Sequence, residues 1–217
     1  GNNNHATQST SANRPTKALN EITFDGSNDS LLLTHGVLPD SNEPSMVFVV
    51  AKVTATSGND GFLSNGRFGN ASQSYSYRTN GTGQLTWYSW GNDFNGNVVY
   101  ANNEKKIHSI ELSVSNNFVK IFENGTLTAT KSNFTGTANA GSENGVIDTT
   151  NGGDYLLGSI YEIIAIKKEP SATQRHNIES YLAHKWSILK GSRPGQDGTV
   201  RIVRPQVSAL AFTSGTL

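Results

Sequence analysis

The chain contains the stretch Gly158-Ser-Ile-Tyr-Glu-Ile-Ile-Ala-Ile166, followed by Pro170-Ser-Ala-Thr-Gln174 and then by residues 175–188. The first piece is an apolar run of strand length, and the proline that follows it predicts a sharp stop. Ser171 at the N-cap, with Gln174 three residues later, forms a capping box and predicts the start of a helix. The sequence therefore predicts a buried strand followed by one well-capped helix.

The predicted helix carries an apolar face. Its members share the spacing i, i+3, i+4 and i+8, namely Ile178, Tyr181, Leu182 and Trp186. This spacing places four side chains on one side of a helix, so we expect that side to pack against the rest of the protein. Gly191 and Pro194 mark the end region of the helix.

The residues before this segment lack helical periodicity and are typical of short strands joined by turns rich in glycine and asparagine. The strand-like pieces are residues 22–24, 31–33, 46–53, 61–66, 75–77, 84–90, 107–114, 118–122, 126–130 and 146–147. Asn116-Asn117 and Asn124-Gly125 predict tight hairpin turns, because asparagine and glycine tolerate left-handed backbone angles.

Composition excludes several classes of function. The 217 residues suit one sandwich domain, and the 17 basic residues balance the 17 acidic ones, so no basic surface for nucleic acid is predicted. No apolar run is long enough to span a bilayer, and the absence of cysteine excludes disulfides and thiolate metal sites. The excess of Asn, Gly, Ser and Thr favours an extracellular protein at a cell surface or a virion surface.

Several motifs, in order along the chain, resemble those of the concanavalin A-like lectin/glucanase superfamily, in the laminin-G-like version of bacteria and phages. The matching motifs are His5-Ala-Thr-Gln8, Asn13-Arg-Pro15, Phe24-Asp-Gly26 with Asp29, Phe122-Glu-Asn-Gly125, Gly158-x-Ile-x-Glu162 and the helix from Gln174 to Trp186. The resemblance implies an all-β fold, a two-sheet antiparallel jelly-roll sandwich with one C-terminal α-helix.

The resemblance covers residues 1–190, which we expect to form this sandwich, while residues 191–217 form a C-terminal extension. Family members begin with another strand, which is missing here, so we expect that it was removed or that a neighbouring chain takes its place. Residues 199–212 read as a strand that pairs with a sheet edge of the same chain or of a neighbouring subunit in a homo-oligomer. The alternative for this extension is a linker towards another domain.

Catalytic residues are not predicted. Glycoside hydrolysis needs two carboxylates about 5–10 Å apart, and the glucanases of this superfamily carry them along one strand. Here residues 159–167 contain only Glu162 and residues 107–114 contain only Glu111. We therefore expect no enzyme, and expect Glu162, as part of the family motif, to anchor the helix or the first loop.

No cofactor is predicted, and calcium is the one metal for which the sequence offers ligands. Asp25 and Asp29 place hard oxygen donors in one turn, and the resemblance implies a calcium ion at a loop rim. The alternative is that both side chains cap the turn through bonds to its backbone.

A cluster of aromatic and polar residues predicts a ligand site. The candidates are Trp87, Tyr88, Trp90, Asn92 and Asp93. Because side chains alternate along a strand, Trp87 and Ser89 face one side and Tyr88 and Trp90 the other, so one pair faces the core and the other is free to stack on a sugar ring. The alternative is that both pairs serve packing.

These observations leave three functions open. The first is a non-catalytic, lectin-like carbohydrate-binding or adhesion module that recognises a glycan. The second is a structural virion decoration, fibre or surface-assembly subunit whose partners are neighbouring protein subunits. The third is a glycoside hydrolase.

Overall fold

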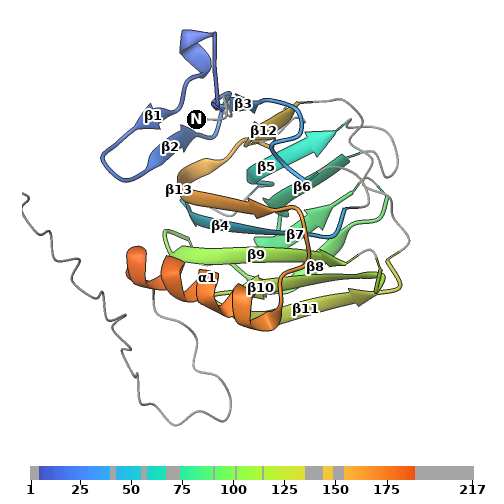
Figure 1. Cartoon of the computed structure of the whole chain (residues 1–217). Coiled ribbons are helices and arrows are strands. Elements are labelled where there is room, and N and C mark those ends of the chain that lie inside the picture. The colour runs from blue at the N-terminus through green and yellow to red at the C-terminus, as the bar shows by residue number, and fades with distance from the viewer. Residues whose placement is uncertain are drawn as a thin grey trace, which may run out of the picture.

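The computed structural model is a sandwich of two antiparallel sheets with an α-helix on its outer side (Figure 1). It describes residues 5–39, 43–54, 58–66, 74–89, 91–100, 102–113, 115–134, 144–148 and 154–188. The predicted all-β jelly-roll sandwich with a C-terminal helix is confirmed. The predicted extension of residues 191–217, with its strand at 199–212, lies outside the described residues.

Within the described residues, each sheet has an order that differs from the order of the sequence. The seven-stranded sheet runs β1 (Thr16–Lys17), β2 (Ile22–Asp25), β13 (Leu157–Ile166), β4 (Ser45–Val53), β9 (Lys105–Ser113), β10 (Phe118–Glu123) and β11 (Thr126–Ser132). The six-stranded sheet runs β3 (Leu31–Leu33), β12 (Gly145–Ile147), β5 (Gly61–Gly66), β6 (Ser74–Thr79), β7 (Gln84–Tyr88) and β8 (Phe94–Val99).

Strand β4 explains why its sequence is apolar at nearly every position. Val47, Val49 and Ala51 face the core between the two sheets, whereas Met46 and Phe48 face the helix on the other side. A strand that is buried on both faces loses the usual alternation of apolar and polar residues. The continuous run of the sequence is therefore the signature of a central strand covered by two layers.

Two asparagines close the hairpins at the predicted places. Asn117 between β9 and β10 has φ +51°, and Asn124 between β10 and β11 has φ +48°, followed by Gly125 at φ +82°. At Asn124-Gly125, left-handed angles at both central residues give the turn that matches the twist of the flanking strands, whereas in the described part of the β9–β10 connection only Asn117 has such an angle. These turns align β9, β10 and β11 as neighbours in the seven-stranded sheet.

Helix α1 (Ala172–Lys185) begins at the predicted capping box. The Ser171 hydroxyl accepts a hydrogen bond from the Gln174 backbone at 3.2 Å, and the Gln174 side chain accepts one from the Ser171 backbone at 2.9 Å. The helix ends at Lys185, earlier than the predicted region of Gly191. Ser187 at φ +54° and the bond from Ile188 N to Ala183 O form a Schellman motif.

The buried face of α1 differs in part from the prediction. Leu182 is fully buried against the seven-stranded sheet, and Ile178 and Trp186 pack at the edge of the same cluster. Tyr181, however, is 50% exposed, whereas Glu179 is 0% exposed. The face is thus rotated towards Glu179, which the apolar pattern does not reveal. No helix in the described part of the chain has the length and apolar character needed to cross a membrane.

Candidate functional site

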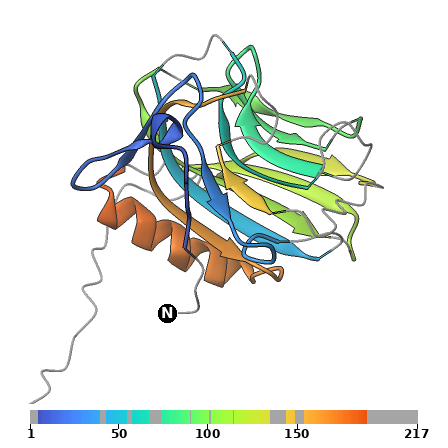
Figure 2. The same ribbon diagram turned by 90° about the horizontal axis from the view of Figure 1, so that it is seen from above.

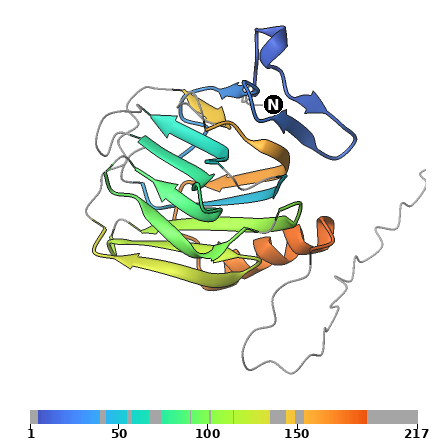
Figure 3. The same cartoon turned by 180° about the vertical axis from the view of Figure 1, so that it is seen from behind.

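A cavity of about 550 Å³ lies between the β1–β2 hairpin, strand β13 and the C-terminal end of α1. We call it the hairpin pocket. Figures 2 and 3 show that the hairpin and this end of the helix lie at the same end of the sandwich. A second cavity of about 430 Å³ adjoins it and shares Asn20, Tyr161, Lys185 and Trp186 with it. Both volumes are in the range of small-molecule binding sites.

Two aromatic rings line both cavities. The rings of Tyr161 on β13 and Trp186 at the end of α1 lie 5.3 Å apart and are inclined by 60°. The ammonium group of Lys105, at the start of β9, lies 4.7 Å from the centre of the Tyr161 ring and 5.7 Å from that of Trp186. The site therefore combines flat apolar surfaces with a cation.

Glu162 holds the helix end against β13. Its carboxylate accepts a hydrogen bond from Trp186 Nε1 at 2.7 Å and lies 3.0 Å from Lys185 Nζ. The hydroxyl of Tyr181 donates a third, weaker bond at 3.3 Å. These contacts agree with the expectation that Glu162 anchors the helix.

Tyr161 lies next to Glu21 of the hairpin in the lining of the pocket. Burial raises the pKa of Tyr161 to about 12, and the neighbouring Glu21 carboxylate adds to the effect. The hydroxyl therefore stays protonated at neutral pH and is a hydrogen-bond donor.

Replacing Trp186 by phenylalanine is expected to lower the free energy of unfolding by about 1–2 kcal/mol, since it removes a hydrogen bond to a partly buried carboxylate. Equilibrium unfolding in urea measures the change. The matched control is Tyr181→Phe, which removes an exposed bond to the same carboxylate and is expected to cost less than about 0.5 kcal/mol. Equal losses in the two variants would contradict the assigned role of Trp186.

The structure corrects the ligand prediction for Trp87. This side chain is 1% exposed and stacks on Tyr75, with ring centres 5.5 Å apart and planes inclined by 14°. Tyr77 and Phe134 contact it edge-on. Trp87 is thus part of the core between the sheets, because its position in β7 faces inward, and it is closed to a sugar.

Tyr88 lies on the opposite face of β7 from Trp87 and is partly exposed. The guanidinium group of Arg78 covers its ring at 3.9 Å from the ring centre. Trp90 lies outside the described residues. One face of the Tyr88 ring is therefore already occupied by a cation.

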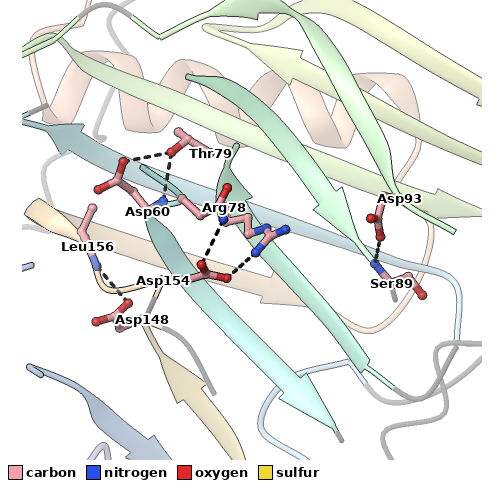
Figure 4. A network of polar contacts seen from close by, with 9 residues as sticks. Asp60, Arg78, Thr79, Ser89, Asp93, Asp148, Asp154 and Leu156 are labelled. Carbon is pink, nitrogen blue, oxygen red and sulfur yellow. Dashed lines mark hydrogen bonds and ion pairs between the residues drawn. The ribbon is translucent and has the colours of Figure 1, made fainter. Parts of the chain in front are cut away.

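Asn92 and Asp93 follow β7 in the loop that leads to β8. Asn92 Oδ1 accepts a hydrogen bond from Lys131 Nζ at 2.6 Å, and Asp93 Oδ1 accepts one from the Ser89 backbone at 3.0 Å (Figure 4). Asp93 thus stabilises its own loop, and Asn92 connects that loop to Lys131 of β11. A ligand site at Tyr88, Asn92 and Asp93 stays a prediction, at a distance in the fold from the hairpin pocket.

The two predicted calcium ligands serve as caps of their own turn. Asp25 Oδ1 accepts hydrogen bonds from the backbone of Ser27 at 2.8 Å and of Asn28 at 3.3 Å. Asp29 Oδ2 accepts one from the Asp25 backbone at 3.0 Å. Across the described ranges, no three His, Cys, Asp or Glu side chains are grouped as a metal site. The geometry fits turn capping, and calcium at these residues stays a prediction.

A network of buried carboxylates joins the ends of β5, β6, β12 and β13 (Figure 4). Asp60 Oδ2 accepts a hydrogen bond from the Thr79 hydroxyl at 3.0 Å, and Asp154 forms an ion pair with Arg78. Asp60 and Asp154 are 4% and 7% exposed. These contacts tie loops that are far apart in the sequence.

Asp148 is the most deeply buried member of this network, at 0% exposure. One of its carboxylate oxygens accepts a hydrogen bond from the Leu156 backbone at 3.1 Å. Burial raises the pKa of Asp148 to about 9, and the nearby charge of Asp60 adds to the effect. Asp148 is thus a neutral acid at pH 7. The network lines neither the hairpin pocket nor the adjoining cavity, so we regard it as structural.

No protein-family model and no curated protein matches the sequence. Solved structures share its fold. One is the CBM40 domain of the Ruminococcus gnavus IT-sialidase bound to α2,3 sialyllactose, with a TM-score of 0.51 and 16% identity over 63% of this chain and 83% of that chain.

Two further solved structures resemble the chain. Domain 4 of AbnA, a GH43 extracellular arabinanase from Geobacillus stearothermophilus, in complex with arabinotriose, has a TM-score of 0.56 and 15% identity over 73% of this chain and 76% of that chain. The heptameric SAP-like pentraxin of Limulus polyphemus has a TM-score of 0.56 and 12% identity over 76% and 84%. These likenesses show a shared jelly-roll sandwich fold, while the narrower laminin-G-like resemblance stays a prediction.

Proposed function

We propose that this protein is a non-catalytic carbohydrate-binding module that holds its sugar in the hairpin pocket. The observation that carries the proposal is the pairing of two aromatic rings, Tyr161 and Trp186, with polar groups in one cavity. Aromatic faces pack against the C–H faces of sugar rings, while a few polar groups fix the orientation of the hydroxyl groups.

The polar groups of the pocket come from three elements. The exposed amide of Asn20 lies on the hairpin, Lys185 lies in the last turn of α1, and Glu162 lies on β13. An amide both donates and accepts hydrogen bonds, as a sugar hydroxyl requires. Because the Glu162 carboxylate is engaged by Trp186 and Lys185, we assign it to positioning and propose no hydrolysis.

The neighbours in fold support the proposal at the level of architecture. The CBM40 domain is bound to sialyllactose and the AbnA domain to arabinotriose, and one fold can carry many functions. We place the module outside the cell, in an adhesion protein at a cell surface or virion surface. The narrower family that we propose is the laminin-G-like one.

A structural role in surface assembly is the second candidate, and one observation favours it. Leu19, between β1 and β2, is 94% exposed on a hairpin that projects from the sandwich (Figure 1). A large exposed apolar side chain on a projecting element is suited to contact with a neighbouring subunit.

One set of variants distinguishes the hairpin pocket from the loop after β7 as the binding site, and carbohydrate binding from surface assembly as the function. On a glycan array, followed by calorimetry with the best ligand, Asn20→Ala is expected to weaken binding by about tenfold, as expected when a buried hydrogen bond to a ligand is lost. The matched control Asn92→Ala is expected to leave binding unchanged. Loss of binding in the control alone would move the site to the loop after β7.

Absence of binding to every glycan, together with a concentration-dependent increase in mass by light scattering, would favour the assembly function. Release of sugar that is lost in Glu162→Gln would favour the hydrolase. Either result would overturn the proposed function.

A further inference from the structure

Two of the three lysines that line the two cavities, Lys17 and Lys105, have no ion pair within the described ranges, and of these two only Lys105 is half-buried. Lys185 pairs with Glu162 at 3.0 Å. Lys106, the neighbour of Lys105 in β9, pairs with Glu123 at 2.9 Å and with Glu104 at 3.3 Å. Lys105 has only ring contacts, and no carboxylate in the described ranges lies within ion-pair distance of it.

Lys105 is held in place despite this lack of an ion pair. Its side chain is half-buried, and the contacts with the Tyr161 and Trp186 rings fix its ammonium group at the wall of the adjoining cavity. A half-buried ammonium group that is not fully solvated gains from an anion at hydrogen-bond distance. When a ring-shaped ligand packs against Tyr161 and Trp186, the substituents at the edge of its ring reach the ammonium group of Lys105.

The remaining charges of the pocket favour one negative charge on the ligand. Lys17, Lys105 and Lys185 face Glu21 and Glu162 in the lining of the two cavities. With all five groups ionised, one positive charge remains uncompensated. The helix end at the pocket is the C-terminus of α1, whose dipole repels anions, so attraction of an anion depends on the lysine side chains.

We propose that the hairpin pocket recognises an acidic sugar and that Lys105 pairs with the carboxylate of that sugar. This inference rests on the proposed function and specifies its ligand class. The sugar ring packs against Trp186 and Tyr161, Asn20 bonds a hydroxyl group, and the carboxylate points towards Lys105. A neutral sugar would leave the ammonium group without its anion on desolvation, which lowers affinity.

The test compares each of two acidic sugars with its own methyl ester. The probes are trigalacturonate and N-acetylneuraminate, because esterification removes the charge and keeps the carbon skeleton. By isothermal titration calorimetry, at least one acid is expected to bind about tenfold or more tightly than its ester. Lys105→Met, which keeps the aliphatic part of the side chain, is expected to reduce binding of that acid to the level of the ester.

Lys120→Met is the matched control. Lys120 also lies over an aromatic ring, 3.8 Å from the centre of Phe118, but outside both cavities. This variant is expected to bind the acid as the wild type does. Lys105→Arg is expected to retain most of the preference for the acid, and thermal melting confirms that each variant is folded.

Other outcomes overturn the inference in distinguishable ways. Equal binding of acid and ester, with both lost in Asn20→Ala, would overturn the acidic ligand and leave the proposed function standing. A preference for the acid that persists in Lys105→Met would overturn the role of Lys105. Failure of both acids and esters, together with failure of neutral glycans, would overturn the proposed function itself.

Discussion

Replacing Arg175 by methionine is expected to lower the free energy of unfolding by about 3–5 kcal/mol, because it leaves Glu179 as an unpaired charge in the protein interior. Glu179 is 0% exposed. Arg175 Nη1 lies 2.7 Å and 2.9 Å from the two oxygens of its carboxylate. The guanidinium group also lies 4.1 Å from the centre of the Phe122 ring, so the pair is enclosed between α1 and the seven-stranded sheet.

The double variant Arg175→Met/Glu179→Met separates the lost attraction from the cost of the orphaned charge. Replacing both partners by apolar groups removes the unpaired charge, so the double variant is expected to recover most of the loss. Chemical denaturation at pH 7 measures all three variants. The control Lys185→Met breaks a more exposed pair and is expected to cost much less than Arg175→Met, because solvent screens that pair. Equal effects of Arg175→Met and Lys185→Met would show that the Arg175 pair is not a buried one.

Acid is expected to destabilise the protein through His108, by an amount on the order of 4–5 kcal/mol at pH 3. His108 is 2% exposed, and its ring stacks on Phe62 at 5.5 Å and lies 4.6 Å from Tyr100. Burial, and to a lesser degree the charge of Lys106, lowers the pKa of His108 from 6.5 to about 3. The folded protein therefore keeps this imidazole neutral.

The direction of the pH effect on stability follows from the pKa of His108 in the unfolded chain, 6.5, and in the folded protein, about 3. Above pH 6.5 the ring is neutral in both states, so the full stability is present. As the pH falls from 6.5 towards 3, the unfolded chain binds a proton that the folded protein does not, and stability is lost across this window. Neither ring nitrogen has a hydrogen-bond partner in the described part of the chain, so phenylalanine loses no such bond.

His108→Phe is therefore expected to be at least as stable as the wild type at pH 7 and to lose less stability in acid. Urea unfolding at pH 7, 5.5 and 4 is expected to show a difference of about 3 kcal/mol between the two proteins by pH 4. The control His184→Phe changes an exposed histidine and should follow the wild type. Parallel loss of stability in wild type and His108→Phe would show that His108 does not carry the effect.

The strands that the sequence predicts are those whose side chains have a clear pattern. Strand β4 is a continuous apolar run because two layers cover it with apolar side chains, whereas β9 carries Ile110 and Leu112 towards the other sheet and the polar but buried Ser109 and Glu111 towards the helix side. Strand β8 was not predicted, since two asparagines and Gly96 interrupt its pattern. Gly96 allows close packing of β8 on β7, because a Cβ atom there would lie 3.1 Å from Leu85 O, which is tighter than an ordinary contact. Such a contact is a property of the folded sandwich and leaves no periodic signal.

The candidate site was less predictable than the fold. Tyr161, Trp186 and Asn20 belong to three segments that only the folded chain brings together, and each segment alone looks like a strand, a helix end or a turn. Local alternation correctly separated Trp87 from Tyr88, but it did not show which of them faces the core. Glu179 was missed because a charged residue is counted as exposed unless its partner, here Arg175, is known to be buried beside it.

The central claim, that a glycan binds in the hairpin pocket, is tested most directly by titrating the ¹⁵N-labelled protein with its best ligand from the glycan array and recording ¹H–¹⁵N spectra. The account predicts shifts of the Trp186 indole N–H and the Asn20 side-chain amide, with the Tyr88 and Asp93 backbone signals unchanged. Shifts confined to Tyr88, Asn92 and Asp93, or no shift with any glycan, would contradict it.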